Sequence, residues 1–323
     1  MIGTRRRIAV LLGICAVLLG LCTACGSEKD GRSGPVAPGF PVRVPDGKQT
    51  VTVPDKPKRV VALGYADIAI ARALGAPIVG AVRYPQGADG RNFPGVRPNL
   101  DAEVADLDLA NPNLERISAL HPDLILATAA QPGYGAVAGK LAQLAPTLSA
   151  PGTPGDWRAQ TTAIGAALGA PDKARQLLAK ADGQLGTFVR EHPYLRGKTA
   201  VFGQTVPAGL QLIVGPDAAT PKLFDRLGLR VPERFAAAQP DQQGAVTLSR
   251  ERLGDLSAAD AAFLYFYAPG FRETGTLTRL DLVRQRRLLE LDGRQAYALL
   301  QPNPANIGYV LDAIRPTLER LRG

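Results

Sequence analysis

The sequence predicts an α/β protein made of two parallel-sheet lobes bridged by one long rigid helix. Its 323 residues exceed what one hydrophobic core usually organises. Short continuous apolar runs alternate with helical patterns, as in parallel sheets that helices cover on both faces. A single amphipathic segment, residues 170–191, separates two sets of such units.

The first 24 residues have the features of a signal peptide. Arg5, Arg6 and Arg7 precede an uncharged apolar run, Ile8 to Cys22, that is shorter than the ~20 residues of an ordinary membrane span. The consecutive arginines leave both the general secretory route and the twin-arginine route open. Export from the cytoplasm is therefore expected by either route.

Small residues occupy the two positions before Cys25, in the order Cys22-Thr23-Ala24-Cys25. This segment resembles the bacterial lipobox, in which the cysteine after the cleaved bond is lipidated and becomes the new N-terminus, although the pattern prefers Leu where Cys22 stands. Residues 25–40 are then a lipidated cysteine and a flexible linker rich in Gly, Ser, Pro and charge. The alternative is a plain secretory signal cleaved near Ala24.

The first α/β lobe is expected over residues 41–168. Two alternating runs, Val42–Val44 and Thr50–Val53, flank a turn-rich link and predict a β-hairpin. In the next unit Asp67 is a plausible helix N-cap and Gly75 a C-terminal stop. The elements expected after the hairpin are strands at 58–63, 77–82, 124–127 and 147–148 and helices at 67–74, 114–120 and 136–144.

Residues 169–192 are expected to form the helix between the lobes. Pro171-Asp172 suits a helix start, and the apolar residues that follow recur every three or four positions. At 1.5 Å per residue such a helix would be about 30 Å long, the diameter of a small domain. An ordinary helix covering one sheet is the alternative interpretation.

The second lobe is expected over residues 193–323. Its apolar runs predict strands at 199–202, 261–267 and 296–300. Helical patterns lie between and after them, at 220–227, 277–289 and 305–321.

Composition excludes several functional classes. Hydrophobic residues at 46% and charged residues at 21% are near globular averages. All three cysteines lie in the first 25 residues, and His121 and His192 stand apart, so we expect no disulfide framework, no metal site and no cofactor. The net charge of +9 comes from scattered arginines without aromatic-basic alternation, so no nucleic-acid partner is expected.

Four segments in a fixed order then indicate a family: residues 57–63, 73–80, 113–125 and 246–253. Together they resemble the iron-siderophore and cobalamin substrate-binding proteins of ABC importers, from about Val42 to about Tyr297, with a weaker match after Arg287. The resemblance implies the helical-backbone type of periplasmic binding protein fold, with the ligand in a cleft between the lobes. It also implies a monomer, tethered to the cell membrane on its extracytoplasmic side, that serves an importer permease and its ATPase.

Candidate ligand-binding residues follow from the rule that open α/β sheets bind ligands beyond the carboxyl ends of their strands. Trp157, Arg83 and Tyr84 also occupy places that resemble cleft positions of the family. The alternatives are a tryptophan that packs on a core or on the interlobe helix, and loop residues that are only solvated. The complete set of candidates is Tyr65, Arg83, Tyr84, Gln131, Tyr134, Trp157, Gln204 and Arg272.

Glu115 and Glu251 are candidates of another kind. Each begins a helical segment in a similar local motif, Asn-Leu-Glu-Arg-Ile and Ser-Arg-Glu-Arg-Leu. The resemblance implies that one carboxylate on each lobe docks into the permease. Each glutamate could equally favour the helix dipole or cap free amides.

The expected function is a lipid-anchored receptor for a ferric siderophore. No enzyme is expected, since the sequence has no Gly-x-Ser-x-Gly elbow, no phosphate loop and no histidine near a plausible partner. Two alternatives remain, a haem- or cobalamin-binding component and a cell-envelope interaction lipoprotein without a ligand.

Overall fold

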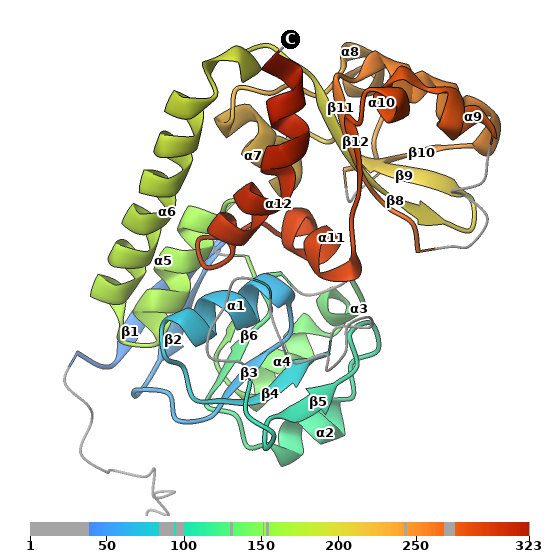
Figure 1. Cartoon of the computed structure of the whole chain (residues 1–323). Helices are drawn as coiled ribbons and strands as arrows, with labels where there is room; N and C mark the ends of the chain where they lie inside the picture. Colours follow the sequence, from blue (N-terminus) through green and yellow to red (C-terminus); the bar gives the residue numbers. More distant parts are fainter. Residues whose placement is uncertain are drawn as a thin grey trace, which may run out of the picture. The chain divides into compact units, whose positions relative to one another are not determined.

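The computed structural model describes residues 39–83, 94, 100–129, 132–150, 152, 155–241, 244–267 and 275–322. Residues Val36–Gly323 form one compact unit. It contains two α/β lobes, each with its own five-stranded sheet, and one helix that runs beside both (Figure 1). Of the helices in this described part, none is long and apolar enough to cross a membrane.

The chain enters the first lobe through a β-hairpin of β1 (Val42–Asp46) and β2 (Gln49–Val53). Asp46 at the turn is buried, and its carboxylate accepts hydrogen bonds from the backbone N–H groups of Ser149 (2.9 Å) and Ala150 (2.6 Å). The hairpin is therefore tied to the segment that follows the last strand of this lobe.

The first sheet is entirely parallel, in the order β5-β4-β3-β6-β7. Its strands are β3 (Val60–Ala62), β4 (Ile78–Val82), β5 (Ala105–Leu107), β6 (Leu124–Leu126) and β7 (Thr147–Leu148). Its helices are α1 (Tyr65–Ala73), α2 (Leu114–Ala119), α3 (Pro132–Gly135) and α4 (Ala138–Leu144). Strand β5 was not predicted, because a three-residue strand with one buried side chain gives no periodic signal.

Helix α6 (Pro171–Glu191) is the predicted bridge between the lobes. Ala174 belongs to the core of the first lobe, whereas Ala181, Leu185 and Phe188 belong to the core of the second. Helix α5 (Trp157–Ala167) packs closely on the first half of α6, since a Cβ on Gly165 would lie 2.4 Å from the Cβ of Ala174. Burial of one stripe along the helix thus fixes α6 to both lobes.

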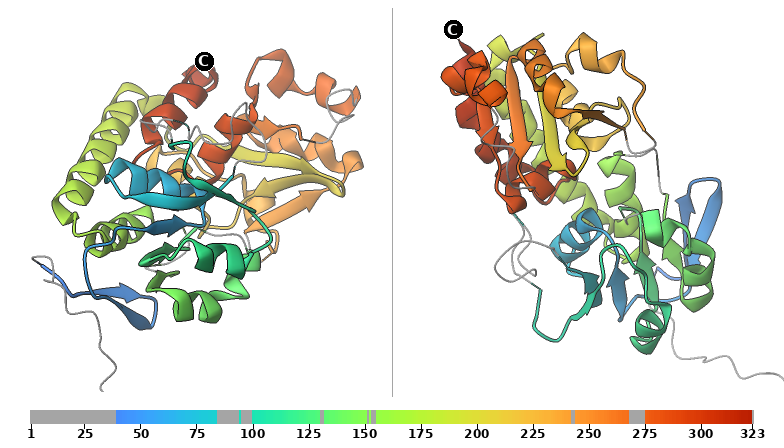
Figure 2. Two further views of the ribbon diagram at one scale, coloured as in Figure 1. Left: turned by 90° about the horizontal axis from the view of Figure 1, so that it is seen from below. Right: turned by 90° about the vertical axis from the view of Figure 1, so that its right-hand side faces the viewer.

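The second sheet is mixed, in the order β10-β9-β8-β11-β12. Its yellow and orange strands form a sheet separate from the blue and green strands of the first lobe (Figure 2). Strands β8, β11 and β12 are parallel, and β9 is antiparallel to both of its neighbours. The strands are β8 (Ala200–Val206), β9 (Gly209–Ile213), β10 (Ala245–Leu248), β11 (Ala261–Tyr265) and β12 (Leu288–Glu290). The α-helices are α7 (Ala219–Arg226), α8 (Glu233–Ala236), α9 (Gly275–Arg279), α10 (Asp281–Arg284), α11 (Gly293–Leu300) and α12 (Ile307–Glu319), and the 3₁₀ helices are η1 (Pro193–Leu195), η2 (Arg250–Ala258) and η3 (Arg320–Arg322).

Two sequence predictions for the second lobe are wrong. The run 296–300, expected as a strand, is helical because Asp292 and Gln295 form a reciprocal capping box that starts α11. The segment 277–289, expected as one helix, divides into α9, α10 and the start of β12. A short apolar run does not by itself distinguish a strand from a helix. Here the capping box before the run favours the helix.

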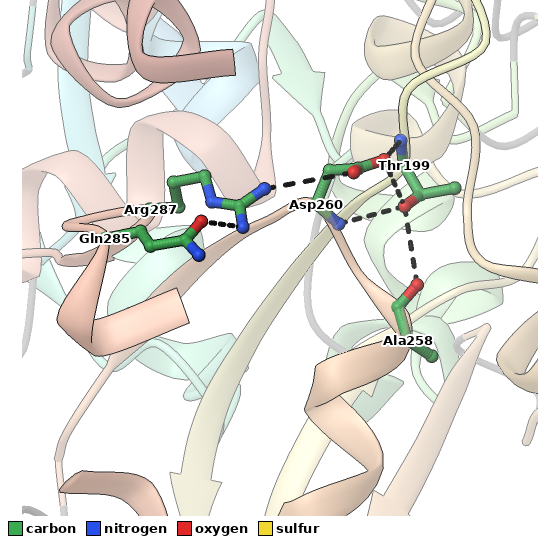
Figure 3. A network of polar contacts seen from close by, with 5 residues as sticks. All are labelled: Thr199, Ala258, Asp260, Gln285 and Arg287. Atoms are coloured by element: carbon green, nitrogen blue, oxygen red, sulfur yellow. Dashed lines mark hydrogen bonds and ion pairs between the residues drawn. The ribbon is translucent and has the colours of Figure 1, made fainter. Parts of the chain in front are cut away.

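A polar network joins the beginnings of the parallel strands of this sheet (Figure 3). The Asp260 carboxylate accepts hydrogen bonds from the backbone N–H and the hydroxyl of Thr199, at 2.8 and 2.9 Å. Arg287, just before β12, lies 4.0 Å from the same carboxylate. These contacts fix the amino ends of β8, β11 and β12 against one another.

We expect Phe188→Ala to destabilise the protein by about 3–5 kcal/mol, because it leaves a cavity in the core of the second lobe, where the Phe188 ring of α6 is buried. Chemical denaturation measures the change in the free energy of unfolding. Val189→Ala is the matched control, since Val189 is the next residue of α6 and is exposed, and it should stay within about 0.5 kcal/mol of the parent. Equal losses in the two variants would contradict the role of Phe188.

Candidate functional site

The lobes meet where helix α1 faces helix α11 (Figure 1). Tyr65 begins α1 directly after β3, and its ring contacts the ring of Tyr297 edge-on, with centroids 4.9 Å apart and planes at 63°. The backbone N–H of Ala66 donates a hydrogen bond to the side-chain oxygen of Gln301 at 3.1 Å. The carboxyl end of the first sheet is therefore in direct contact with the second lobe.

Two further tyrosines lie at the carboxyl end of β11. Tyr265 is its last residue, Tyr267 follows two positions later, and the two ring centroids are 6.4 Å apart. Tyr267 is 62% exposed. Burial first, and then the neighbouring phenols of Tyr265 and Tyr267, raise the pKa of Tyr297 to about 12. We call Tyr65, Tyr265, Tyr267 and Tyr297 the tyrosine cluster.

The tyrosine cluster offers aromatic faces and hydrogen-bond donors. A phenol whose pKa is about 12 remains protonated at neutral pH, so Tyr297 presents an O–H group instead of a phenolate. Burial also raises the pKa of Tyr265 above its ordinary value. Such side chains suit an organic ligand with flat apolar parts and acceptor oxygens. Among the described residues, no group of three or more His, Cys, Asp and Glu could hold a bare metal ion.

Side-chain amides continue this surface on the second sheet. Gln204 of β8 lies in register with Tyr265 of β11 on one side and with Gln211 of β9 on the other. Because paired positions on adjacent strands share a face, the three side chains lie in one row. The Gln204 amide donates to the Gln211 side-chain oxygen at 3.2 Å.

Arg83 lies on the first-lobe side of the same region. It is exposed after β4, and its guanidinium is 3.2 Å from the Asp106 carboxylate. Its backbone carbonyl accepts a hydrogen bond from the Tyr65 hydroxyl at 3.4 Å. Of the residues predicted from the sequence, the structure thus gathers Tyr65, Arg83 and Gln204 around the tyrosine cluster.

Trp157 lies elsewhere. It is 8% exposed, belongs to the core of the second lobe with residues of α6, and carries the Arg226 guanidinium 5.1 Å from its ring centroid. Asp182 of α6 pairs with both Arg226 and Arg158; burial opposes a low pKa for this carboxylate, but the two arginines hold it below its ordinary value. The placement matches the alternative interpretation, a tryptophan that packs on the interlobe helix.

A cavity of about 1000 Å³ lies beside Trp157, lined by the start of α5, by α7 and by residues 229–231. Arg230, which lines this cavity, forms an isolated parallel β-bridge with Thr199, the residue immediately before β8. The cavity therefore opens at the amino end of β8, whereas the tyrosine cluster lies at the carboxyl ends of the parallel strands. Nearby, Gly155 approaches the other lobe so closely that a Cβ would lie 2.8 Å from the Asp217 carbonyl oxygen.

Tyr134 is placed in the interior of the first lobe. It is 1% exposed, and its hydroxyl donates to the backbone carbonyl of Asp108 at 2.6 Å. Burial, together with the Asp108 carboxylate, raises its pKa to about 12. In this conformation the side chain supports the lobe and presents almost no surface.

Glu115 and Glu251 are both exposed, one on each lobe. Helix α2 takes its cap from Asn113, whose side chain accepts the Arg116 N–H at 2.9 Å, so this capping bond does not involve Glu115. A hydrogen bond from the Ser249 side chain holds the pKa of Glu251 below its ordinary value. Both carboxylates are thus accessible to a partner.

Four predicted residues lie outside the described part of the chain: Cys25, Tyr84, Gln131 and Arg272. They remain predictions.

Sequence reasoning missed Tyr265, Tyr267, Tyr297 and Gln301. The predicted strand 261–267 contained the first two, so the strand-end rule selected Arg272 beyond them. Tyr297 fell in the predicted strand 296–300, which is in fact part of α11, and Gln301 directly follows that run. The spacing of Asp292 and Gln295 is the signal that could have indicated a helix start.

A buried carboxylate supports the first-lobe side of the site. Asp67, expected as the N-cap of α1, lies inside the helix, which starts after Gly64. Its side chain is fully buried and accepts hydrogen bonds from the Thr128 hydroxyl, the Ala129 N–H (3.1 Å) and the Gln160 amide (3.4 Å). Burial raises the pKa of Asp67 to about 6, although these hydrogen bonds oppose the rise.

Comparison with known proteins identifies the family. Residues 60–291 match the family model described as periplasmic binding protein, and the chain therefore belongs to that family. The family resemblance and the two-lobed fold inferred from the sequence are thereby confirmed.

A curated relative and several solved structures are similar to this chain. The relative, named "Probable siderophore-binding lipoprotein YfiY", from Bacillus subtilis, is 27% identical over 219 residues, which are 67% of this chain and 65% of the relative's length. A periplasmic solute binding protein from Mycobacterium smegmatis superposes with a TM-score of 0.72 at 25% identity, over 87% of this chain and 99% of its own. Staphylococcus aureus SirA, complexed with staphyloferrin B, superposes with a TM-score of 0.67 at 22% identity, over 87% and 98%.

We expect the stability of the protein to rise by about 1 kcal/mol from pH 7 to pH 5 through Asp67 alone. Its pKa is raised in the folded state, so its contribution is greatest below the unfolded value of 3.8 and is lost as pH rises through about 6. Asp67→Asn should remove this part of the pH dependence in denaturation curves taken at both pH values. If the free energy of unfolding changed equally between pH 7 and pH 5 in parent and variant, a raised pKa for Asp67 would be contradicted.

Proposed function

We propose that this protein is an extracytoplasmic substrate-binding protein that binds a ferric siderophore between its lobes and delivers it, chemically unchanged, to an ABC importer. The observation that carries the proposal is the tyrosine cluster, which both lobes supply at the carboxyl ends of their parallel strands. Ligands of open α/β sheets bind at this edge.

The chemistry of the tyrosine cluster favours a metal that arrives already chelated. Protonated phenols and amides donate hydrogen bonds to the chelating oxygens of a siderophore, and the aromatic faces pack against its organic shell. The exposed Arg83 adds a charged donor for a chelate that carries negative charge. None of these contacts requires the protein to coordinate iron, so the ferric chelate as a whole is the proposed cargo and the protein needs no cofactor to bind it.

The similar proteins support the same class of ligand. The curated relative is named for siderophore binding, and the solved structures include complexes with staphyloferrin B and with ferrichrome. Haem and cobalamin, which also present a flat organic body, are the competing ligands. A cell-envelope lipoprotein without a ligand is the competing class, motivated by the weaker family match after Arg287.

We propose that Cys25 carries the lipid that tethers the protein to the outer face of the cell membrane. The small residues before Cys25 and the lipoprotein name of the curated relative support this anchor. The partners are then the importer permease with its ATPase, and the protein acts as a monomer. Glu115 and Glu251, exposed on separate lobes, are the proposed contacts with the permease.

Native mass spectrometry of the purified protein with hydroxamate, catecholate, mycobactin-type and haem ligands tests the proposed function, because the mass reports both the chelate and its iron. We expect one class of ferric chelate to bind at one copy per chain. Tyr267→Ala should weaken this binding about tenfold, since it removes an exposed aromatic contact. Tyr194→Phe, a tyrosine of the second lobe remote in sequence from the tyrosine cluster, is the control and should bind like the parent.

Two outcomes of this experiment would contradict the proposed site or function. Binding that survives Tyr267→Ala but is lost in Arg230→Gln would place the ligand in the cavity beside Trp157. Absence of binding across the whole panel would favour the lipoprotein without a ligand.

Replacing Glu115 and Glu251 together by Gln should abolish siderophore-dependent growth while chelate binding stays within about twofold of the parent. The reason is that both side chains are exposed, and the change removes charge without removing a packing contact. Growth of a complemented deletion strain on the chelate measures transport, and mass spectrometry measures binding. Glu233→Gln, an exposed acid of α8, is the matched control and should support normal growth. Normal growth of the double variant would exclude these carboxylates as the docking contacts.

A further inference from the structure

Helix α1 starts without a cap of its own. Its N-cap residue is Gly64, which has no side chain to accept a hydrogen bond from the first turn. The amides at the start of a helix have no partner within the helix and need an external acceptor. Only glycine fits at position 64, because a Cβ there would lie 2.4 Å from the backbone of Ala129. A capping side chain therefore cannot be accommodated at this position.

The missing acceptor comes from the other lobe. Gln301, the C-cap residue that follows α11, accepts the hydrogen bond from the Ala66 N–H through its side-chain oxygen, at 3.1 Å. The two residues are 235 positions apart in the chain. A helix of the first lobe is thus capped by a side chain of the second.

A buried asparagine pair holds Gln301 in place. Its backbone carbonyl accepts hydrogen bonds from the side-chain amides of Asn303 (3.0 Å) and Asn306 (3.2 Å). Both asparagines are almost completely buried. The Asn306 side-chain oxygen in turn accepts the Asn303 N–H at 2.9 Å, which closes the turn between α11 and α12. These bonds fix the backbone of Gln301, and with it the point from which its side chain extends to α1.

The capping bond and the tyrosine contact belong to one interface. Tyr297 lies four residues before Gln301, the C-cap of α11, and its backbone carbonyl accepts a hydrogen bond from the Gln301 N–H at 3.1 Å. Their partners, Tyr65 and Ala66, are the first two residues of α1. Fixing Gln301 on α1 therefore fixes Tyr65 and Tyr297 relative to each other.

We propose that Gln301 is a positioning residue, which caps helix α1 across the lobe boundary and thereby sets the geometry of the tyrosine cluster. Its effect on ligand binding rests on the proposed function, whereas the cap itself does not. Helix α6 is buried in the cores of both lobes independently of this contact, so loss of the cap leaves the protein folded.

Amide hydrogen exchange of the ligand-free full chain tests the cap, with the Ala66 amide as the readout. Gln301→Met keeps the length of the side chain but removes the acceptor, and should speed exchange at Ala66 about fivefold, as expected for a lost cap. Gln301→Glu keeps an acceptor and adds a negative charge at a helix N-terminus, so exchange should be equal to the parent or slower. Gln176→Met, the same change at an exposed glutamine of α6, is the control and should leave exchange at Ala66 unchanged.

Unchanged exchange at Ala66 in Gln301→Met, or fast exchange in Gln301→Glu, would overturn the proposal. Affinity for the chelate that binds the parent is the second readout. It should fall about three- to tenfold in Gln301→Met and be retained in Gln301→Glu. If no chelate binds the parent, the proposed function fails while the exchange result still decides the cap. If the cap is present but affinity is the same in all variants, Gln301 does not act on the tyrosine cluster.

Discussion

The structure depends on one helix that is buried in two cores at once. Helix α6 contributes Ala174 to the first lobe and Ala181, Leu185 and Phe188 to the second, along a single stripe. Because a helix bends little over 21 residues, the two sheets cannot move independently at this side of the molecule. The relative position of the two carboxyl edges, where a ligand would bind, follows from this constraint.

Other interlobe contacts adjust the arrangement that α6 sets. Two of them, among the described residues, are the start of α1 against α11 and the segment before α5 against the start of α7. Both use groups at helix termini, where backbone amides need partners and side chains can lie close together. The tyrosine cluster forms at the first of these contacts, so its geometry is a consequence of how the lobes meet.

The character of this site is aromatic and protonated. Burial raises the pKa of the Tyr265 and Tyr297 phenols above the ordinary value, and the amides of Gln204 and Gln211 add polar groups without charge. A bare ferric ion would need anionic ligands, whereas a chelate needs packing and hydrogen bonds. The family membership and the chemistry of the site are independent observations, and both favour the proposed chelate over a bare metal ion.

The sequence alone determined the α/β class, the bridging helix and the family, because these depend on periodic patterns and local motifs. It also selected Tyr65, Arg83 and Gln204, since strand ends can be located from short apolar runs. The tertiary structure decided that Trp157 packs on α6, that Asp67 is buried, and that Tyr297 and Gln301 reach α1 from a helix more than 200 residues away in the chain. Such contacts join distant segments, and no local pattern specifies which side chain meets which across a lobe boundary.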